Sequence, residues 1–166
     1  MDDLDALFDD VASRIEAEEF QAGMGEAGEL GAAEAGAVSL VMLLRAAIGQ
    51  QLELLTCGGV VHLSIEAVSD TVVVGRPAEP GFSAIAVPAR AIMEIGSTPR
   101  YAVAAQSSSR ALGLGAVLRR YVGNDVVVTT NSGVLRRGVL RRAGQDWCEV
   151  AGRVIAFEAI SAVRMR

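Results

Sequence analysis

Paired arginines recur in the last third of the chain, and their type and spacing suit one defined chemistry. Each guanidinium can donate two parallel hydrogen bonds to a phosphate group, so neighbouring arginines favour polyanions. Nine arginines follow Leu118, against four acidic residues. Two aromatic residues in the same segment could stack on unpaired bases. The pattern predicts RNA or DNA as the ligand, with phosphate bound at Arg119, Arg120, Arg136, Arg137, Arg141 and Arg142, and stacking at Tyr121 and Trp147.

The charge of the chain is uneven, and this leaves a second interpretation open. Residues 1–35 hold eleven acids against Arg14 alone, whereas the rest of the chain holds nine acids against fourteen arginines. The arginines could therefore form a solvated strand face, or a patch that holds the chain's own acidic segment. On that interpretation the chain is a structural or adaptor protein that mediates protein–protein interaction and self-association.

No residue pattern typical of catalysis or metal binding stands out. His62 is the single histidine, and as a base it would need an orienting carboxylate, so a surface or packing role is expected. Cys57 and Cys148 lack a CxxC or Cys/His grouping, which predicts reduced thiols. The glycines at 113 and 115 follow no predicted strand, which argues against a phosphate loop. We therefore expect a non-enzymatic binding module with no cofactor and no metal.

An internal repeat organises the elements that must position the arginines. Leu44-Arg45 and Gly49 match Leu118-Arg119 and Gly123, and a constant offset carries this match through the next turn and strand. Such duplication predicts two copies of one supersecondary unit. The further matches are Gly59 with Gly133, His62 with Arg136, Ile65 with Val139, Asp70 with Asp146, Ala91-Ile92 with Ala159-Ile160, and Ile95 with Val163.

Each copy is predicted to contain a short helix and about five strands, because apolar residues alternate along short segments bounded by turn residues. The helices are expected near 37–47 and 111–121. The strands are expected at 52–56, 60–68, 71–74, 84–87 and 91–95, with a loop over 75–81, and then at 126–130, 135–142, 147–150 and 154–163. The units span 37–96 and 111–166, joined by a linker over 97–110. The residues expected to point inward are Leu52, Leu54, Ile65, Val73, Ile92, Val126, Val128, Leu140, Val150 and Ile160.

A glycine pattern in the second copy carries a family resemblance. It reads Gly133-x-x-x-x-Gly138-x-Leu140, where the first glycine suits a turn and the second lets a strand bend. With this pattern the chain resembles the Sm-like fold of Hfq and the Sm proteins, and also an uncharacterised actinobacterial family with tandem Sm-like barrels and an acidic N-terminal helix. The resemblance implies a mainly β chain of two tandem Sm-like, SH3-like five-stranded antiparallel barrels, each preceded by a short helix. It does not carry over Hfq-like uridine binding, because the Sm base-binding residues are absent apart from one Asp.

The N-terminal segment is predicted to form an acidic amphipathic helix over 1–20, followed by a Gly/Ala/Glu linker over 21–36. Its acidic face should be repelled by phosphate and by anionic lipid, so a protein partner is expected and a membrane is not. The absence of a basic n-region predicts a cytoplasmic chain. Open strand edges predict a homo-oligomer, either a dimer or a small ring. The predicted docking face consists of Leu4, Leu7, Phe8, Val11 and Ile15.

Overall fold

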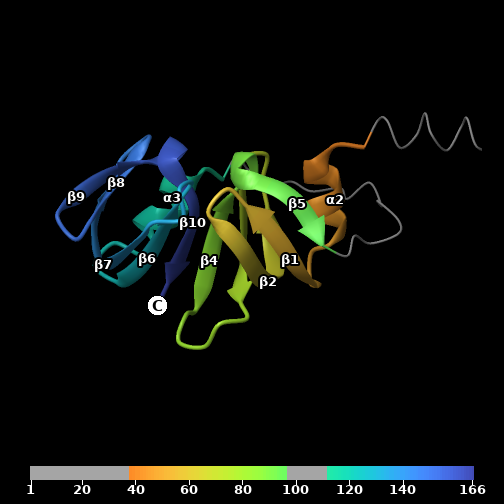
Figure 1. Cartoon of the computed structure of the whole chain (residues 1–166), viewed down its shortest axis with the longest axis horizontal. Helices are drawn as coiled ribbons and strands as arrows, with labels where there is room; N and C mark the ends of the chain where they lie inside the picture. The colour runs from red at the N-terminus through yellow and green to blue at the C-terminus, as the bar shows by residue number, and fades with distance from the viewer. Residues whose placement is uncertain (1–37, 97–111) are drawn as a thin grey trace, which may run out of the picture. The chain divides into compact units, whose positions relative to one another are not determined.

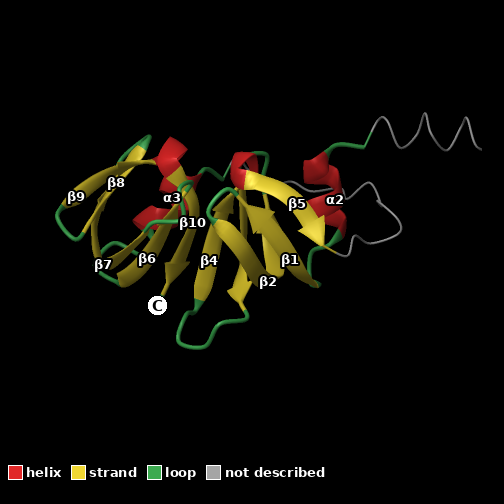
Figure 2. Ribbon diagram, in the orientation of Figure 1, coloured by secondary structure: helices red, strands yellow, loops and turns green. Residues whose placement is uncertain are grey.

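The computed structural model describes residues 38–96 and 112–166. From Leu40 to Arg166 the chain forms one compact unit. Strands dominate this unit, with a few short helices (Figure 1) (Figure 2), which confirms the predicted mainly β class. The predicted helix over 1–20 with its docking face, and the linkers over 21–36 and 97–110, lie outside the described residues.

A short helix opens each half of the unit, and strands follow it. The first half contains α2 (Leu40–Ala46), β1 (Gln51–Thr56), β2 (Gly59–Val68), β3 (Val72–Pro77), β4 (Ala84–Pro88), the 3-10 turn η1 (Ala89–Ala91) and β5 (Ile92–Gly96). The second half contains α3 (Leu114–Arg119), β6 (Asp125–Thr130), β7 (Leu135–Ala143), β8 (Trp147–Val150), β9 (Arg153–Ala156), the 3-10 turn η2 (Phe157–Ala159) and β10 (Ile160–Met165). Two expectations were wrong: β3 continues to Pro77 where a loop was expected from residue 75, and a 3-10 turn splits the predicted strand 154–163.

The ten strands form a single antiparallel sheet in the order β5-β1-β2-β3-β4-β10-β6-β7-β8-β9. Each half therefore repeats the same internal order, with its last strand placed beside its first. The halves meet where β4 pairs with β10, and Figure 1 shows these two strands side by side. Within the described residues no pairing closes either half on itself, so the structure shows one continuous sheet and not two separate closed barrels.

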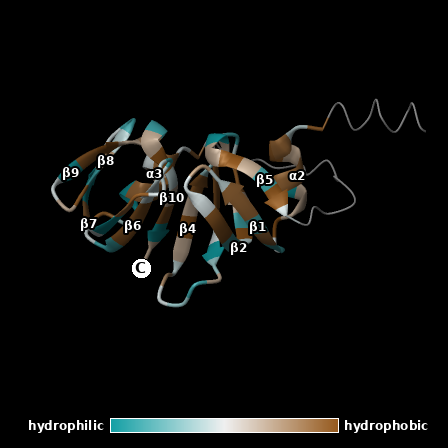
Figure 3. Ribbon diagram, in the orientation of Figure 1, coloured by the Kyte–Doolittle hydropathy of each residue, from teal (hydrophilic) through white to brown (hydrophobic). Residues whose placement is uncertain are grey.

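Buried side chains form two clusters, each centred on one half and completed at the junction by residues of the other half. All ten residues predicted to point inward are at most 8% exposed, which confirms the strand alternation on which they depended. We call the cluster around Leu54, Ile65 and Val73 the first core, and the cluster around Val128, Leu140 and Val150 the second core. Figure 3 shows that the helix α2, which covers the first core, is almost entirely hydrophobic.

Backbone hydrogen bonds confirm the internal repeat and correct its register by one residue. The Gly49 amide donates to the Ile65 carbonyl at 2.8 Å, and the Gly123 amide donates to the Leu140 carbonyl at 2.8 Å. Ile65 therefore corresponds to Leu140 and not to Val139, which is 44% exposed. The β6–β7 turn is one residue longer than the β1–β2 turn. A shift of one residue along a strand moves each side chain to the opposite face of the sheet. By the same shift His62 corresponds to Arg137 and Asp70 to Gln145, so the pairs His62/Arg136 and Asp70/Asp146 were wrong.

Strand β7 keeps one alternation across Gly138. Leu135 is 58% exposed while Leu140 is fully buried, so the two side chains lie on opposite faces, and the register shift comes later, between Leu140 and Arg142. A Cβ at Gly138 would lie 2.9 Å from the Cβ of Ala151. The absence of a side chain at Gly138 thus allows a close approach of β7 to the β8–β9 turn, and the bend expected at this glycine stays a prediction.

Candidate nucleic-acid interface

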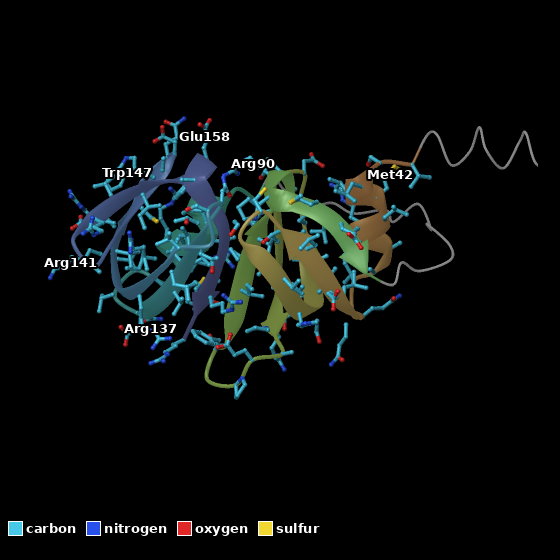
Figure 4. The ribbon with its side chains drawn as sticks, viewed as in Figure 1. Met42, Arg90, Arg137, Arg141, Trp147 and Glu158 are labelled. Atoms are coloured by element: carbon cyan, nitrogen blue, oxygen red, sulfur yellow. The ribbon has the colours of Figure 1, made fainter. Side chains whose placement is uncertain are left out.

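The doublet Arg136-Arg137 of β7 is divided between the two faces of the strand. Successive residues of a strand point to opposite faces, and accordingly Arg137 is exposed while Arg136 is only half-exposed. Arg141 is also exposed, but Figure 4 shows it well away from Arg137. The six predicted phosphate-binding arginines are therefore distributed over several surfaces.

Trp147 is already covered by its own chain. The Arg142 guanidinium lies 5.4 Å from the Trp147 ring centroid, and the Arg142 Nε donates a 2.7 Å hydrogen bond to the Glu149 carboxylate. A Cβ on Gly144 would lie 2.5 Å from the indole Nε1. Figure 4 places Trp147 far from Arg137. The structure thus brings Arg142 and Trp147 together, but as an internal cation–π pair and not as an open stacking platform.

Residues 119–121 face different surroundings. Arg119 donates a 3.2 Å hydrogen bond to the Gly144 carbonyl and lines a hollow of about 480 Å³ together with Arg90. Arg90 in turn donates to the Phe157 carbonyl. Arg120 is exposed, while Tyr121 is half-buried against the second core. Tyr121 is therefore used in packing, and stacking on a base would require it to leave the core.

Strand pairing creates a basic groove that the sequence alone does not reveal. Val127 of β6 lies opposite Arg137 of β7 on one side and opposite Arg164 of β10 on the other. Paired residues of neighbouring strands point to the same face, and two strand spacings place these arginines about 10 Å apart. The guanidinium of Arg166 lies 5.6 Å from the ring centroid of Phe82 at the same place. The groove has a volume of about 290 Å³ and is lined by Gly58, Glu79, Phe82, Val127, Thr129, Gly133, Leu135, Arg137 and Arg164.

A buried valine underlies the basic groove, and the arginines of the groove are only partly neutralised. Val127 is 5% exposed but belongs to neither core, because its side chain lies on the groove face of the sheet. The Arg164 Nε lies 3.1 Å from the Glu79 carboxylate, and its Nη1 donates to the Thr129 hydroxyl at 3.2 Å. Within the two described ranges, neither Arg137 nor Arg166 forms an ion pair with an acid. Two guanidinium groups beside an apolar, aromatic surface can bind a phosphate and a base together.

In the first half, the three paired residues at the equivalent positions of neighbouring strands carry a different charge. Glu53 lies between Gly96 and His62, where the second half has Val127 between Arg164 and Arg137. His62 Nδ1 lies 3.6 Å from the Glu53 carboxylate in an exposed hollow of about 410 Å³. Residues 38–96 hold three arginines and five acids, whereas residues 112–166 hold nine arginines and four acids. The basic groove is thus specific to the second half.

The cysteines and the potential metal ligands of the described part of the chain are further candidates. Among the described residues, His, Cys, Asp and Glu side chains do not come together in the groups of three that hold a metal. Burial raises the pKa of the Cys148 thiol to about 11, so this side chain stays protonated at neutral pH. In residues 38–96 and 112–166 we find no helix with the length and apolar character needed to cross a membrane.

Comparisons of the chain with protein-family models, with curated proteins and with solved structures return no match. The chemistry of its own residues therefore has to support any function.

Proposed function

We propose that the chain is a non-enzymatic, Sm-like binding module that binds single-stranded RNA or DNA in the basic groove of its second half. The observation that supports this is the convergence of Arg137, Arg164 and Arg166 beside Phe82. Phosphate contacts supply most of the affinity of such proteins, and the planar Arg166 guanidinium over Phe82 gives an unpaired base a sequence-independent surface on which to stack.

A single strand fits the groove better than a duplex. Its volume of about 290 Å³ suits one unstacked base, whereas a duplex keeps its bases stacked and paired. Arg137 and Arg166 remain available for two phosphates, while Arg164 is already paired with Glu79. The groove therefore favours a base flanked by two phosphate contacts.

We also propose that each half is an Sm-like barrel, and that the chain shares the tandem architecture of the actinobacterial family that it resembles. Each half has the strand order 5-1-2-3-4, and one core is centred on each half, with Ala86 and Ala162 each packed in the core of the other half. In this arrangement β4 of the first barrel pairs with the last strand of the second.

The acidic N-terminal segment is proposed to weaken nucleic-acid binding. Its eleven acids repel phosphate at long range and compete for the same arginines. Deleting residues 1–36 should therefore strengthen binding of a labelled oligonucleotide, and the difference should shrink as salt screens both effects.

The test is fluorescence anisotropy with labelled single-stranded RNA and DNA over a salt series. Each neutralised phosphate of a single strand contributes about -0.7 to the slope of log affinity against log salt. The double variant Arg137→Gln/Arg166→Gln should therefore reduce the slope by about 1.4 units. A matched variant, Arg120→Gln/Arg141→Gln, removes the same charge outside the groove and should change the slope by less than half as much. Trp147 fluorescence should not respond to binding.

Three outcomes would contradict the proposal. Equal losses in the two double variants would indicate that total charge and not the groove binds nucleic acid. A larger loss in Arg120→Gln/Arg141→Gln, with quenching of Trp147, would favour the sites predicted from the arginine doublets. No saturable binding at low salt, even by the chain lacking residues 1–36, would end the nucleic-acid hypothesis.

A second candidate function, that of a structural or adaptor protein, is supported by apolar residues on the outermost strands. Met93 of β5 is 67% exposed and Val154 of β9 is 66% exposed. Such edges suit pairing with another chain. Affinity purification from the native cell, with and without nuclease treatment, separates the two functions, because protein partners of an adaptor survive nuclease treatment.

A further inference from the structure

The basic groove shares a wall with a second hollow. This neighbour has a volume of about 310 Å³, and beside the shared residues it is lined by Val60, Val61, His62, Pro77 and Ala78. We call it the valine hollow. Glu79 and Arg164 line both the valine hollow and the basic groove, and the Arg164 Nε lies 3.1 Å from the Glu79 carboxylate. The ion pair of these two residues therefore lies between the two hollows.

The two partners of this ion pair differ in their freedom to move. The Arg164 side chain is only 18% exposed, and its Nη1 also donates to the Thr129 hydroxyl at 3.2 Å. The Glu79 side chain is 56% exposed and belongs to the loop that connects β3 with β4, which projects from the sheet in Figure 1. The Glu79 carboxylate can therefore turn into solvent while the Arg164 guanidinium stays in place.

The valine hollow offers the kind of surface on which an unpaired base can lie. Val60 is 48% exposed, while Val61 and Pro77 are buried. The volume of the valine hollow is close to that of the basic groove, which suits one unstacked base. A base that covers Val60 removes apolar surface from water. The valine hollow thus matches a base, and Arg164 beside it matches a phosphate.

We propose that Glu79 is an acidic gate between the basic groove and the valine hollow. A single strand that continues beyond the basic groove displaces the Glu79 carboxylate from Arg164 and binds a phosphate there. Its next base then lies in the valine hollow. The preferred ligand is therefore a strand with one unstacked base in each hollow and a phosphate on Arg164 between them. This inference rests on the proposed function, because it requires nucleic acid in the basic groove.

The exchange at Arg164 is most favourable for a ligand that reaches both hollows. An ion pair with a partly exposed partner strengthens an equilibrium by at most about fivefold. A phosphate that replaces Glu79 keeps the largely buried guanidinium paired, and base contacts in the valine hollow are gained in addition. Inorganic phosphate makes the same exchange without the base contacts. Glu79 therefore selects strands over free phosphate.

A double-mutant cycle in the full chain tests the gate, with fluorescence anisotropy of a labelled single-stranded RNA at fixed salt as the measurement. Glu79→Gln removes the internal competitor for Arg164, so binding should become about fivefold tighter. Glu94→Gln removes the same charge from an exposed position on β5 and should change the affinity by less than about twofold. In an Arg164→Gln background, Glu79→Gln should likewise change the affinity by less than about twofold. Equal gains from the two glutamate variants, or a fivefold gain that persists without Arg164, would overturn the gate.

Removal of apolar surface tests the valine hollow independently of charge. Val60→Ser should weaken binding about threefold, because less apolar surface is covered by the base. The matched control is Val122→Ser, since Val122 is 46% exposed and lies outside both hollows. This control should change the affinity by less than about 1.5-fold. Circular dichroism checks that every variant is folded, and equal binding by the two serine variants would overturn the second base site.

These results separate a failure of the gate from a failure of the proposed function. If the gate is wrong and the basic groove is right, Arg137→Gln/Arg166→Gln still weakens binding, while Glu79→Gln and Val60→Ser behave like their controls. Inorganic phosphate should compete with the labelled strand more effectively in Glu79→Gln than in the unmodified chain, and equal competition would also overturn the gate. Absence of saturable binding at low salt would overturn both proposals.

Discussion

Substitution of Gly58 tests whether the two halves share a rigid junction. Gly58 lies in the β1–β2 turn of the first half, yet its neighbours belong to β6 and β10 of the second half. A Cβ at this position would overlap the Ser161 hydroxyl and would lie 2.5 Å from the Thr130 carbonyl oxygen and 2.9 Å from the Thr129 Cγ2. None of these atoms is the end of a long flexible side chain.

The neighbours of Gly58 cannot easily move, because hydrogen bonds hold them. The Ser161 hydroxyl donates to the Thr129 and Thr130 carbonyls at 3.1 and 3.2 Å. Overpacking costs about 1–3 kcal/mol, and loss of a hydrogen bond adds about 1 kcal/mol. We therefore expect Gly58→Ala to lower the free energy of unfolding by about 3 kcal/mol, which for a unit of this size lowers Tm by about 10 °C.

Thermal and urea unfolding followed by circular dichroism provide the measurement, and Gly113→Ala is the matched control. A Cβ at Gly113 meets nothing within 4 Å and its φ of -86° suits any residue, so this variant should change stability by less than about 0.5 kcal/mol. The double variant Gly58→Ala/Ser161→Ala should be less destabilised than the sum of its single variants. If Gly58→Ala is as stable as Gly113→Ala, the halves are not held together at this junction and the reasoning fails.

Two further predictions concern the second core. Leu140→Ala should lower the free energy of unfolding by about 3 kcal/mol, measured by urea unfolding, because Leu140 is fully buried. Val139→Ala should lower it by less than about 0.5 kcal/mol, because Val139 is 44% exposed. Comparable losses in the two variants would contradict the corrected register of the repeat. The pKa of the Cys148 thiol, raised from 9.0 to about 11 by burial, means that the folded state favours the neutral thiol. The stability that the neutral Cys148 thiol contributes to the folded state is complete below pH 9. It is lost as the pH rises from 9 to 11, because the thiol ionises in the unfolded chain before it ionises in the folded chain. The stability difference between the chain and its Cys148→Ala variant, measured by urea unfolding, should therefore shrink over that range, and a constant difference would contradict it.

The sequence predicts the elements of this fold well, because apolar alternation is a local property. Ten inward residues and most strand bounds follow from it, as does the equivalence of Ile95 and Val163. The sequence predicts correctly that Leu140 points inward, yet the constant offset of the repeat pairs Ile65 with Val139, since a turn longer by one residue leaves the composition of the strand unchanged. That single residue decides that Leu140 is buried and Val139 is exposed.

The basic groove could not be predicted for a different reason. Arg137, Arg164 and Phe82 are far apart in the sequence, and they meet only because β10 pairs with β6 and the β3–β4 loop lies beside it. Neighbouring arginines in the sequence are a misleading signal here, because a strand sends Arg136 and Arg137 to opposite faces. A useful signal would have been two basic residues that lie opposite the same residue of the strand between them. Finding such a pair in the sequence requires knowledge of the strand order.

The basic groove depends on the junction between the two halves. In the first half the strand equivalent to β10 is β5, which has Gly96 in place of Arg164, and the neighbouring strand has Glu53 in place of Val127. The loop that carries Phe82 corresponds in the second half to the two-residue turn between β8 and β9, which contains no aromatic residue. Within the described residues each chain therefore contributes one basic groove. A short oligonucleotide should then bind one groove per chain, while a longer strand that reaches the grooves of two chains gains affinity from their linkage.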